Sequence, residues 1–374
     1  MSDVSIILPV HNASKWLDEC LKSISDQTFT GSLELSAYDD ASTDDSFDLL
    51  EVWRSKLKEK NIQVTLMKNK YGSPKGVGFA RNRAVENSCG HFLCFLDADD
   101  VMSVERVQIQ YNAAFEHPEC LIGSRFHREP SDSMKRFTLW ANTLNEEQLQ
   151  TQIFTSHGPT IAMPTWFCSR ELFDKVGGFS EDGQGTPEDL IFFYKHLDLK
   201  GSVIRVNSDL LMYRYHSSCT TFSVSEETIW NIRLQRFERD ILNHLSHFTI
   251  WNAGKQGRKF YRSLKPDNRK KVSMFCDVDA KKIKKAVYIY EESQESPKPR
   301  VPICHFSKAE PPIVICMKMY FTELDTSTDV LVKNFASQWR SFRFSPTVWH
   351  FRQVSFTISP GSTKALRVDL VEGN

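Results

Sequence analysis

Apolar runs that each end in a polar or acidic cluster recur through the first hundred residues. The clearest are VSIILPVHN at 4–12, SAYDDASTD at 36–44 and FLDADD at 95–100, and ARNRA at 80–84 belongs to the same series. Runs of this length and composition are typical of buried parallel strands. Ligands of an open α/β sheet bind beyond the carboxyl ends of its strands, so we expect these clusters to meet in one crevice.

Four carboxylates would share that crevice: Asp39, Asp40, Asp97 and Asp99. Burying so many negative charges together is unfavourable unless a divalent cation and a phosphorylated ligand occupy the same place. The residues therefore indicate binding of a nucleotide diphosphate through a metal.

Segments with helical periodicity lie between these runs. In KWLDECLKSISDQ at 15–27, for example, Trp16, Leu17 and Leu21 fall on one face. This alternation predicts an α/β fold with a mostly parallel sheet. The chain has 374 residues and is 40% hydrophobic, which is enough for two domains with cores of their own.

Cysteine spacing and hydropathy lead to two negative expectations. The nine cysteines lack CxxC spacing, which indicates neither a disulfide framework nor a zinc site and favours reduced thiols. The start at Met1 lacks a signal-like segment, and no apolar stretch is long enough to span a bilayer. A cytoplasmic protein without a membrane partner is expected.

The order and spacing of these motifs resemble the nucleotide-sugar half of family 2 glycosyltransferases, which have the GT-A fold. The matching pieces are Pro9 to Asn12, the run from Asp39 to Asp44, Ala80 to Asn82, Asp97 to Asp99, VGGF at 176–179 and Glu188-Asp189. One departure is Ala41, where family members usually carry glycine. The resemblance covers about 220 residues, and the ordered set is more specific than any single motif.

The resemblance implies a UDP-sugar donor held by residues from several of these motifs: Pro9, Val10, His11, Asn12, Asp39, Asp40, Lys75, Arg81, Asp97 and Ala98. A carboxylate after the second apolar run can accept the uracil N3–H. The alternative is that Ser42, Thr43 and Asp44 only start the next helix, and both interpretations can hold at once.

A divalent cation, Mn²⁺ or Mg²⁺, is expected beside Asp99. Asp97 and Asp99 alternate along an extended segment and so face the same side. Carboxylate oxygens bind either ion, and the resemblance assigns Asp99 to the metal. His216 follows LLMYRY, where the resemblance implies a second ligand and the alternative is a structural histidine.

Glu188 and Asp189 are the expected catalytic carboxylates. Inverting transfer requires a base for the attacking hydroxyl, and the resemblance assigns that role to Asp189. A helix N-terminus there would keep this carboxylate ionised. The alternative is a simple helix start, with Thr186 as N-cap and Pro187 at the first position.

A second, basic unit is expected after the glycosyltransferase domain. The sequence predicts a domain at 1–224, a helical connector at 225–247, a Rossmann-like unit at 248–319 and a tail of uncertain structure at 320–374. Residues 251–300 carry 14 Lys/Arg and 6 Asp/Glu, hence 14 − 6 = +8. Candidate RNA contacts are Lys255, Arg258, Lys259, Arg262, Lys270 and Lys271, and the alternative is a solvated charged face.

The combination of the two units resembles a tRNA-modifying glycosyltransferase. That resemblance implies transfer of galactose from UDP-galactose to the cyclopentene hydroxyl of queuosine in tyrosine tRNA. One alternative is a UDP-GlcNAc-dependent β-1,3-N-acetylglucosaminyltransferase acting on a glycan. The other is a non-catalytic protein that binds RNA or a nucleotide sugar.

Overall fold

The computed structural model describes residues 2–154, 157–217, 219–316 and 348–350. They form two compact units. Unit 1 comprises Met1–Gln150 and Gly158–Thr228, and unit 2 comprises Thr151–His157 and Ile229–Asn374. The helix expected as a connector, α9 (Glu226–Asp240), lies in unit 2 from Ile229 onward.

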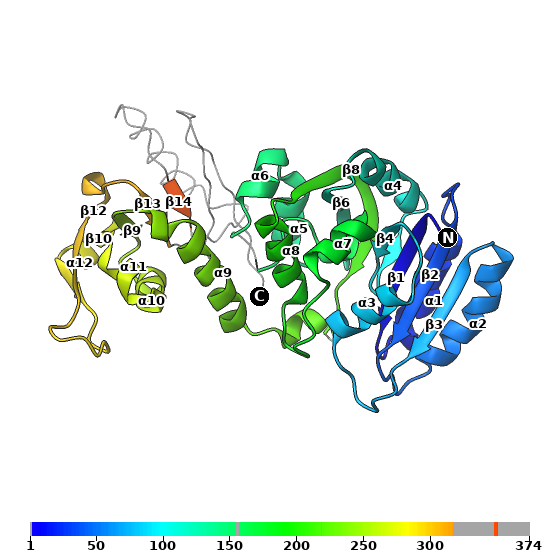
Figure 1. Cartoon of the computed structure of the whole chain (residues 1–374). Coiled ribbons are helices and arrows are strands. Elements are labelled where there is room, and N and C mark those ends of the chain that lie inside the picture. Colours follow the sequence, from blue (N-terminus) through cyan, green and yellow to red (C-terminus); the bar gives the residue numbers. More distant parts are fainter. Residues whose placement is uncertain (1, 155–156, 218, 317–347, 351–374) are drawn as a thin grey trace. The chain divides into compact units, whose positions relative to one another are not determined.

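Unit 1 is built on an eight-stranded sheet (Figure 1) in the order β3-β2-β1-β4-β7-β6-β8-β5. The strands are β1 (Val4–Val10), β2 (Leu33–Asp39), β3 (Gln63–Lys68), β4 (Phe92–Phe95), β5 (Val101–Met102), β6 (Cys120–Glu129), β7 (Phe167–Ser169) and β8 (Ser202–Arg214). Strands β1 to β4 run parallel, whereas β7 is antiparallel to both of its neighbours, β4 and β6. All residues of β1 and β2 are buried, as expected for central parallel strands. The predicted mostly parallel α/β sheet is confirmed.

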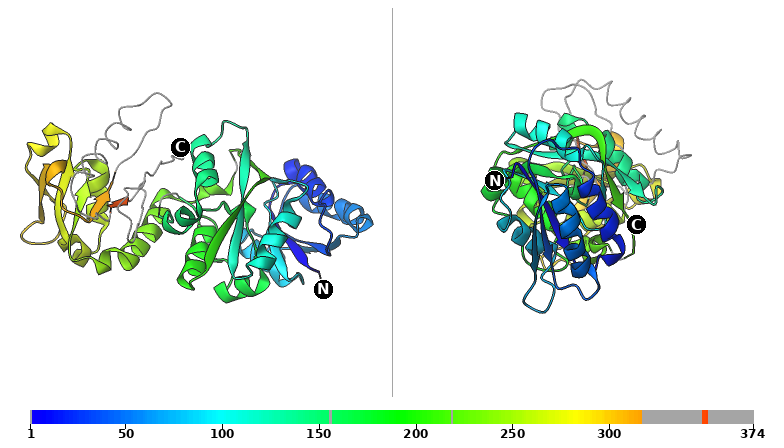
Figure 2. Two further views of the ribbon diagram at one scale, coloured as in Figure 1. Left: turned by 90° about the horizontal axis from the view of Figure 1, so that it is seen from above. Right: turned by 90° about the vertical axis from the view of Figure 1, so that its right-hand side faces the viewer.

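Helices cover both faces of strands β1 to β4. They include α1 (Ser14–Ser25), α2 (Ser46–Glu59) and α3 (Val77–Glu86). The further helices of the chain up to β8 are α4 (Arg106–Glu116), α5 (Lys135–Thr143), α6 (Glu146–Thr151), α7 (Arg170–Val176) and α8 (Glu188–Asp198). The two views in Figure 2 show the dark-blue α1 and the lighter-blue α2 side by side. Figure 1 shows α2 and α3 on opposite sides of the strands. This arrangement follows from right-handed crossovers that reverse direction after β3.

An aromatic cluster holds α7 and α8 against the sheet. The rings of Phe179 and Phe192 lie 4.9 Å apart, and Phe173 packs against both. Trp166 stacks on Phe193 and is fully buried. Large buried rings of this kind contribute strongly to stability. The cluster therefore fixes the position of α8, which begins at the candidate catalytic pair.

Unit 2 has a six-stranded sheet in the order β11-β12-β10-β9-β13-β14. The strands are β9 (Phe248–Trp251), β10 (Val272–Asp277), β11 (Val287–Ile289), β12 (Arg300–His305), β13 (Ile313–Ile315) and β14 (Val348–His350). Its further helices are α10 (Lys255–Ser263), α11 (Pro266–Lys270) and α12 (Ala280–Ile283). Only β11 is antiparallel to its neighbour. Apart from β14, the expected tail at 320–374 lies outside the described residues.

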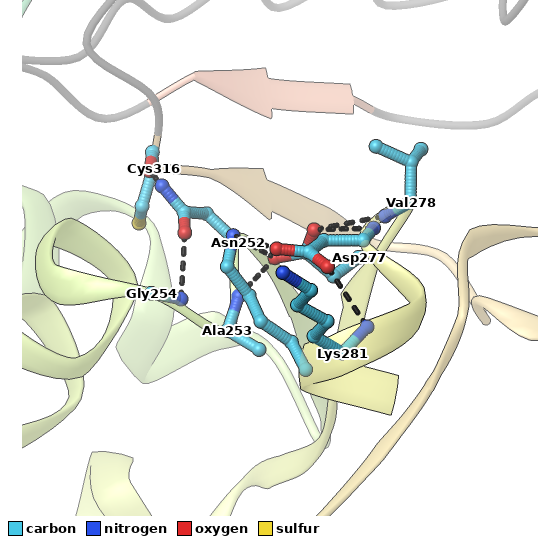
Figure 3. A network of polar contacts seen from close by, with 9 residues as sticks. Asn252, Ala253, Gly254, Asp277, Val278, Lys281 and Cys316 are labelled. Carbon is cyan, nitrogen blue, oxygen red and sulfur yellow. Dashed lines mark hydrogen bonds and ion pairs between the residues drawn. The ribbon is translucent and has the colours of Figure 1, made fainter. Parts of the chain in front are cut away.

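The sequence NAGKQG at 252–257 forms a glycine-containing turn from β9 into α10, and a polar network around Asp277 contacts this turn (Figure 3). One carboxylate oxygen accepts from Ala253 N at 2.9 Å and from the Lys282 ammonium at 3.0 Å. The other accepts from the backbone N–H groups of Val278 and Asp279. Because both oxygens are used within the unit, the geometry favours a structural role for this turn over dinucleotide binding.

Among the described helices, each is either too short or too polar to cross a bilayer.

Candidate active site

The ends of β1 and β2 are joined by hydrogen bonds between their loops. His11 Nδ1 donates to Asp40 O at 2.8 Å, and Asn12 Oδ1 accepts from Thr43 N at 2.8 Å. Pro9 and Val10 are buried within β1, so the exposed side chains of this segment are those of His11 and Asn12.

Ala41 lies between these loops with a φ of +59°, in the left-handed region. A β-carbon is disfavoured there, and glycine is the residue that adopts this conformation without cost. The structure thus explains physically why Ala41 stands out as a departure from the family pattern.

We expect Ala41→Gly to stabilise unit 1. An alanine in the left-handed region costs the folded state about 1–2 kcal/mol, and glycine removes this cost. Glycine also raises the conformational entropy of the unfolded chain, which offsets about half of that gain. Urea unfolding should show a net gain of about 0.5–1 kcal/mol. The matched control Ala113→Gly, inside α4, should lose about 1 kcal/mol. A loss of stability in Ala41→Gly would contradict the interpretation.

Asp39 and Asp40 have different surroundings although they are adjacent. Asp40 accepts from Asn69 Nδ2 at 2.6 Å and from the backbone N–H groups of Lys75 and Gly76, each at 2.8 Å. Its carboxylate therefore fastens the loop that carries Lys75. Asp39 accepts from Ser42 N through Oδ1, while its buried Oδ2 has no hydrogen-bond partner among the described residues. Only Asp39 thus has a carboxylate oxygen left for a ligand.

Arg81 connects two of the expected site motifs. Its guanidinium donates to Asp97 Oδ1 and to Glu188 Oε1, each at 2.6 Å, and the residue is 3% exposed. Burial lowers the pKa of Arg81, but the Asp97 and Glu188 carboxylates outweigh it and raise that pKa. Arg81 therefore stays charged and aligns these two carboxylates.

Asp99 lies beside His216, 117 residues further along the chain. Asp99 Oδ2 and His216 Nε2 are 2.8 Å apart, and Trp16 stacks on the imidazole with 5.4 Å between ring centroids. Burial, followed by repulsion from Asp97, raises the pKa of Asp99. Carboxylate oxygens suit Mn²⁺ and Mg²⁺, and imidazole nitrogen is a common ligand of other divalent metals, so this pair could hold a divalent cation.

Cys219 joins this pair and was not among the predicted site residues. One ligand atom from each of Asp99, His216 and Cys219 lies within 4.8 Å of the others. The sequence signal was available but weak, because Cys219 follows His216 by three residues without a second cysteine nearby.

Helix α8 begins at Glu188, so the predicted carboxylate pair lies in its first turn. The alternative interpretation placed Thr186 at the N-cap and Pro187 at the first helical position, and this assignment is wrong. Pro187 occupies the N-cap position, and no side chain caps the helix. Burial and then the Glu188 charge raise the pKa of Asp189 to about 7. The helix N-terminus alone would lower that pKa, so the surroundings outweigh the helix dipole.

Residues 5–177 match the model of the Glycosyl transferase family 2. This segment is therefore similar to family 2 glycosyltransferases. The GT-A fold class predicted from the motif order is thereby confirmed.

Bacterial glycosyltransferases are similar to this domain. The glycosyltransferase GlyG of Streptococcus pneumoniae is 23% identical over 227 residues, covering 57% of this chain and 71% of GlyG. The poly(ribitol-phosphate) beta-N-acetylglucosaminyltransferase TarS of Staphylococcus aureus is 33% identical over 109 residues, which are 29% of this chain and 18% of TarS. A crystal structure of TarS with UDP-GlcNAc aligns over 70% of each chain with a TM-score of 0.48 and 19% identity.

The candidate RNA contacts lie in unit 2, outside the segment that matches the family model. Lys255, Arg258, Lys259 and Arg262 follow helical spacing along one side of α10. Arg258 lies 5.0 Å from the Tyr288 ring centroid. Lys270 is an exposed residue of α11, whereas the Lys271 ammonium donates to Leu242 O at 2.7 Å. Lys271 is thus engaged with a turn of its own unit and does not extend the basic row of α10.

Proposed function

We propose that the chain is an inverting, metal-dependent glycosyltransferase that uses a UDP-sugar donor. The observation that carries this proposal is the Asp99–His216 pair, with its atoms 2.8 Å apart, within a unit that contains the segment matching the Glycosyl transferase family 2 model. Asp99 and His216 would hold the cation, and a bound cation would stabilise the negative charge of the leaving diphosphate.

Residues around this pair bind different parts of the UDP-sugar donor. Asp39 Oδ2, which lacks a partner among the described residues, accepts the uracil N3–H. Asp97, aligned by Arg81, binds the donor beside Ala98. His11 and Asn12 border the base and ribose, and Lys75 closes over the donor from the loop that Asp40 fastens.

Asp189 is the proposed general base. It takes the proton of the acceptor hydroxyl as that oxygen attacks the anomeric carbon from the face opposite UDP. A pKa of about 7 makes the carboxylate basic enough to receive this proton near neutral pH. Glu188 is held by Arg81 and raises the basicity of Asp189 through its charge.

The specific reaction that we propose is transfer of galactose from UDP-galactose to the cyclopentene hydroxyl of queuosine in tyrosine tRNA. Residues 1–318 resemble queuosine-tRNA galactosyltransferase in their motifs, and the basic row on α10 suits a polyanionic acceptor. N-acetylglucosamine is the second candidate sugar, because the relative TarS is named as an N-acetylglucosaminyltransferase.

A donor and acceptor panel tests this reaction. Purified protein is incubated with radiolabelled UDP-galactose, UDP-glucose or UDP-GlcNAc and with tRNA that contains or lacks queuosine. Label should pass from UDP-galactose only to the queuosine-containing tRNA. Transfer from UDP-GlcNAc to a glycan would support the second candidate, and no transfer to any acceptor would favour a non-catalytic binding protein.

Charge reversal on α10 tests the proposed tRNA contact. Phosphate contacts release counterions, so tRNA affinity should fall steeply with salt. Reversing Lys255, Arg258 and Lys259 to Glu should lower the affinity for tRNA. The slope of log affinity against log salt concentration should become less negative by about 0.7–0.9 for each lost phosphate contact. The control variant reverses the charges of Lys281, Lys284 and Lys285, which are exposed lysines outside α10. Equal effects of both triple variants would contradict a contact specific to α10.

A further inference from the structure

Cys219 lies at the cation site without a role in the proposed reaction. Its thiol is half-buried, and its Sγ accepts from His216 N at 3.3 Å. Cys219 N in turn donates to His216 O at 3.1 Å. These two hydrogen bonds hold Cys219 beside His216, and its sulfur lies within 4.8 Å of a ligand atom of the imidazole.

We propose that Cys219 is a third protein ligand of this site and gives it a preference for soft divalent ions such as Zn²⁺ and Cd²⁺ over Mg²⁺. This inference rests on the cation site of the proposed function, and it adds the Cys219 sulfur to the ligands Asp99 and His216. Thiolate favours Zn²⁺ and similar soft ions, whereas Mg²⁺ prefers a shell of oxygen ligands.

The donor spacing is compatible with one shared ion. Metal bonds to carboxylate, imidazole and thiolate measure about 2.0–2.3 Å, so two donors on one ion lie at most about 4.6 Å apart. The three donor atoms lie within 4.8 Å of one another before any ion is bound, and a shift of a few tenths of an ångström closes the set. Binding through sulfur releases the thiol proton to solvent.

The simpler alternative is that Cys219 only makes these hydrogen bonds with His216. Serine distinguishes the two roles, because its hydroxyl can accept the same hydrogen bond from His216 N but is not a soft ligand. The experiment therefore compares the wild-type chain with Cys219→Ser. Cys89→Ser serves as the control, since Cys89 is an exposed thiol away from this cluster.

Cation binding is measured by calorimetry and by the ultraviolet absorbance of the cadmium–thiolate bond. Cys219→Ser should lose that absorbance and bind Zn²⁺ and Cd²⁺ at least about tenfold more weakly, while its Mg²⁺ affinity changes little. Cys89→Ser should behave like the wild type. Unchanged Zn²⁺ and Cd²⁺ affinities in Cys219→Ser would overturn the proposal.

A second measurement needs no variant and stands even if Cys219→Ser does not fold. Iodoacetamide labelling of the wild type, read by peptide mass spectrometry, reports each cysteine separately. Zn²⁺ should slow labelling of Cys219 but leave Cys89 unaffected, and Mg²⁺ should protect neither. If Mn²⁺ binds but Zn²⁺ does not protect Cys219, only this inference fails. If no divalent ion binds, the cation site of the proposed function fails as well.

Discussion

Asp189→Asn should reduce turnover by about 10²–10⁴-fold, the usual contribution of a general base, while UDP-sugar binding stays nearly intact. The amide has almost the same shape but cannot accept the proton of the attacking hydroxyl. Single-turnover kinetics and calorimetric UDP binding separate the two effects. Asp174→Asn, an exposed carboxylate on α7, is the matched control and should keep full activity.

The raised pKa of Asp189 adds two pH-dependent signatures to this experiment. The base must be ionised, so wild-type kcat/KM should rise with pH and level off above about 7. Stability should change in the opposite direction. Because the folded pKa of about 7 exceeds the ordinary 3.8, the folded state binds the proton more tightly, and that stabilisation is lost as pH rises between these values.

The amide side chain of Asp189→Asn does not titrate, so the variant lacks this pH-dependent loss of stability. The Tm of Asp189→Asn minus the Tm of the wild type should therefore increase from pH 4 to pH 8. A variant that is less stable at every pH, with normal turnover of its folded fraction, would show that Asp189 only supports the start of α8.

Asp99→Ala should abolish metal-dependent UDP binding and lower transfer by at least about 100-fold, or about 2.7 kcal/mol of transition-state stabilisation. The protein should remain folded, because the substitution removes a half-buried charge that is repelled by Asp97. The Asp99 carbonyl oxygen, which accepts from Arg214 Nε at 2.8 Å, is kept. Calorimetry of UDP with and without Mn²⁺ measures the effect.

The matched control for Asp99 is Asp209→Ala, which removes an exposed carboxylate paired with His127. Its metal-dependent UDP binding should equal that of the wild type. Full wild-type transfer in the presence of EDTA, or unchanged Mn²⁺-dependent UDP binding in Asp99→Ala, would contradict the proposed cation role.

The mostly parallel sheet and the convergence of its strand ends could be predicted from the sequence. Apolar runs such as VSIILPV are typical of buried parallel strands, and parallel strands bring their carboxyl ends to one edge of the sheet. The local position of Glu188 and Asp189 at the start of a helix follows from the same kind of short-range pattern.

Only the tertiary structure distinguished between neighbouring residues of the same type. Asp39 and Asp40 look alike in the sequence, yet long-range contacts from the loop at 69–76 use both oxygens of Asp40 and leave one oxygen of Asp39 available. Likewise, the protonation of Asp189 depends on burial by distant segments, which outweighs the effect of its own helix.

The pairings across the site were also decided by tertiary structure. Arg81 meets Glu188 107 residues away, and His216 brings Cys219 to Asp99. Sequence periodicity reports which face of an element a residue occupies, and the nine scattered cysteines carried no metal spacing. Which of these residues meet depends on how β8 and α8 pack beside the parallel strands. Short-range sequence patterns do not specify contacts between segments that are far apart in the chain.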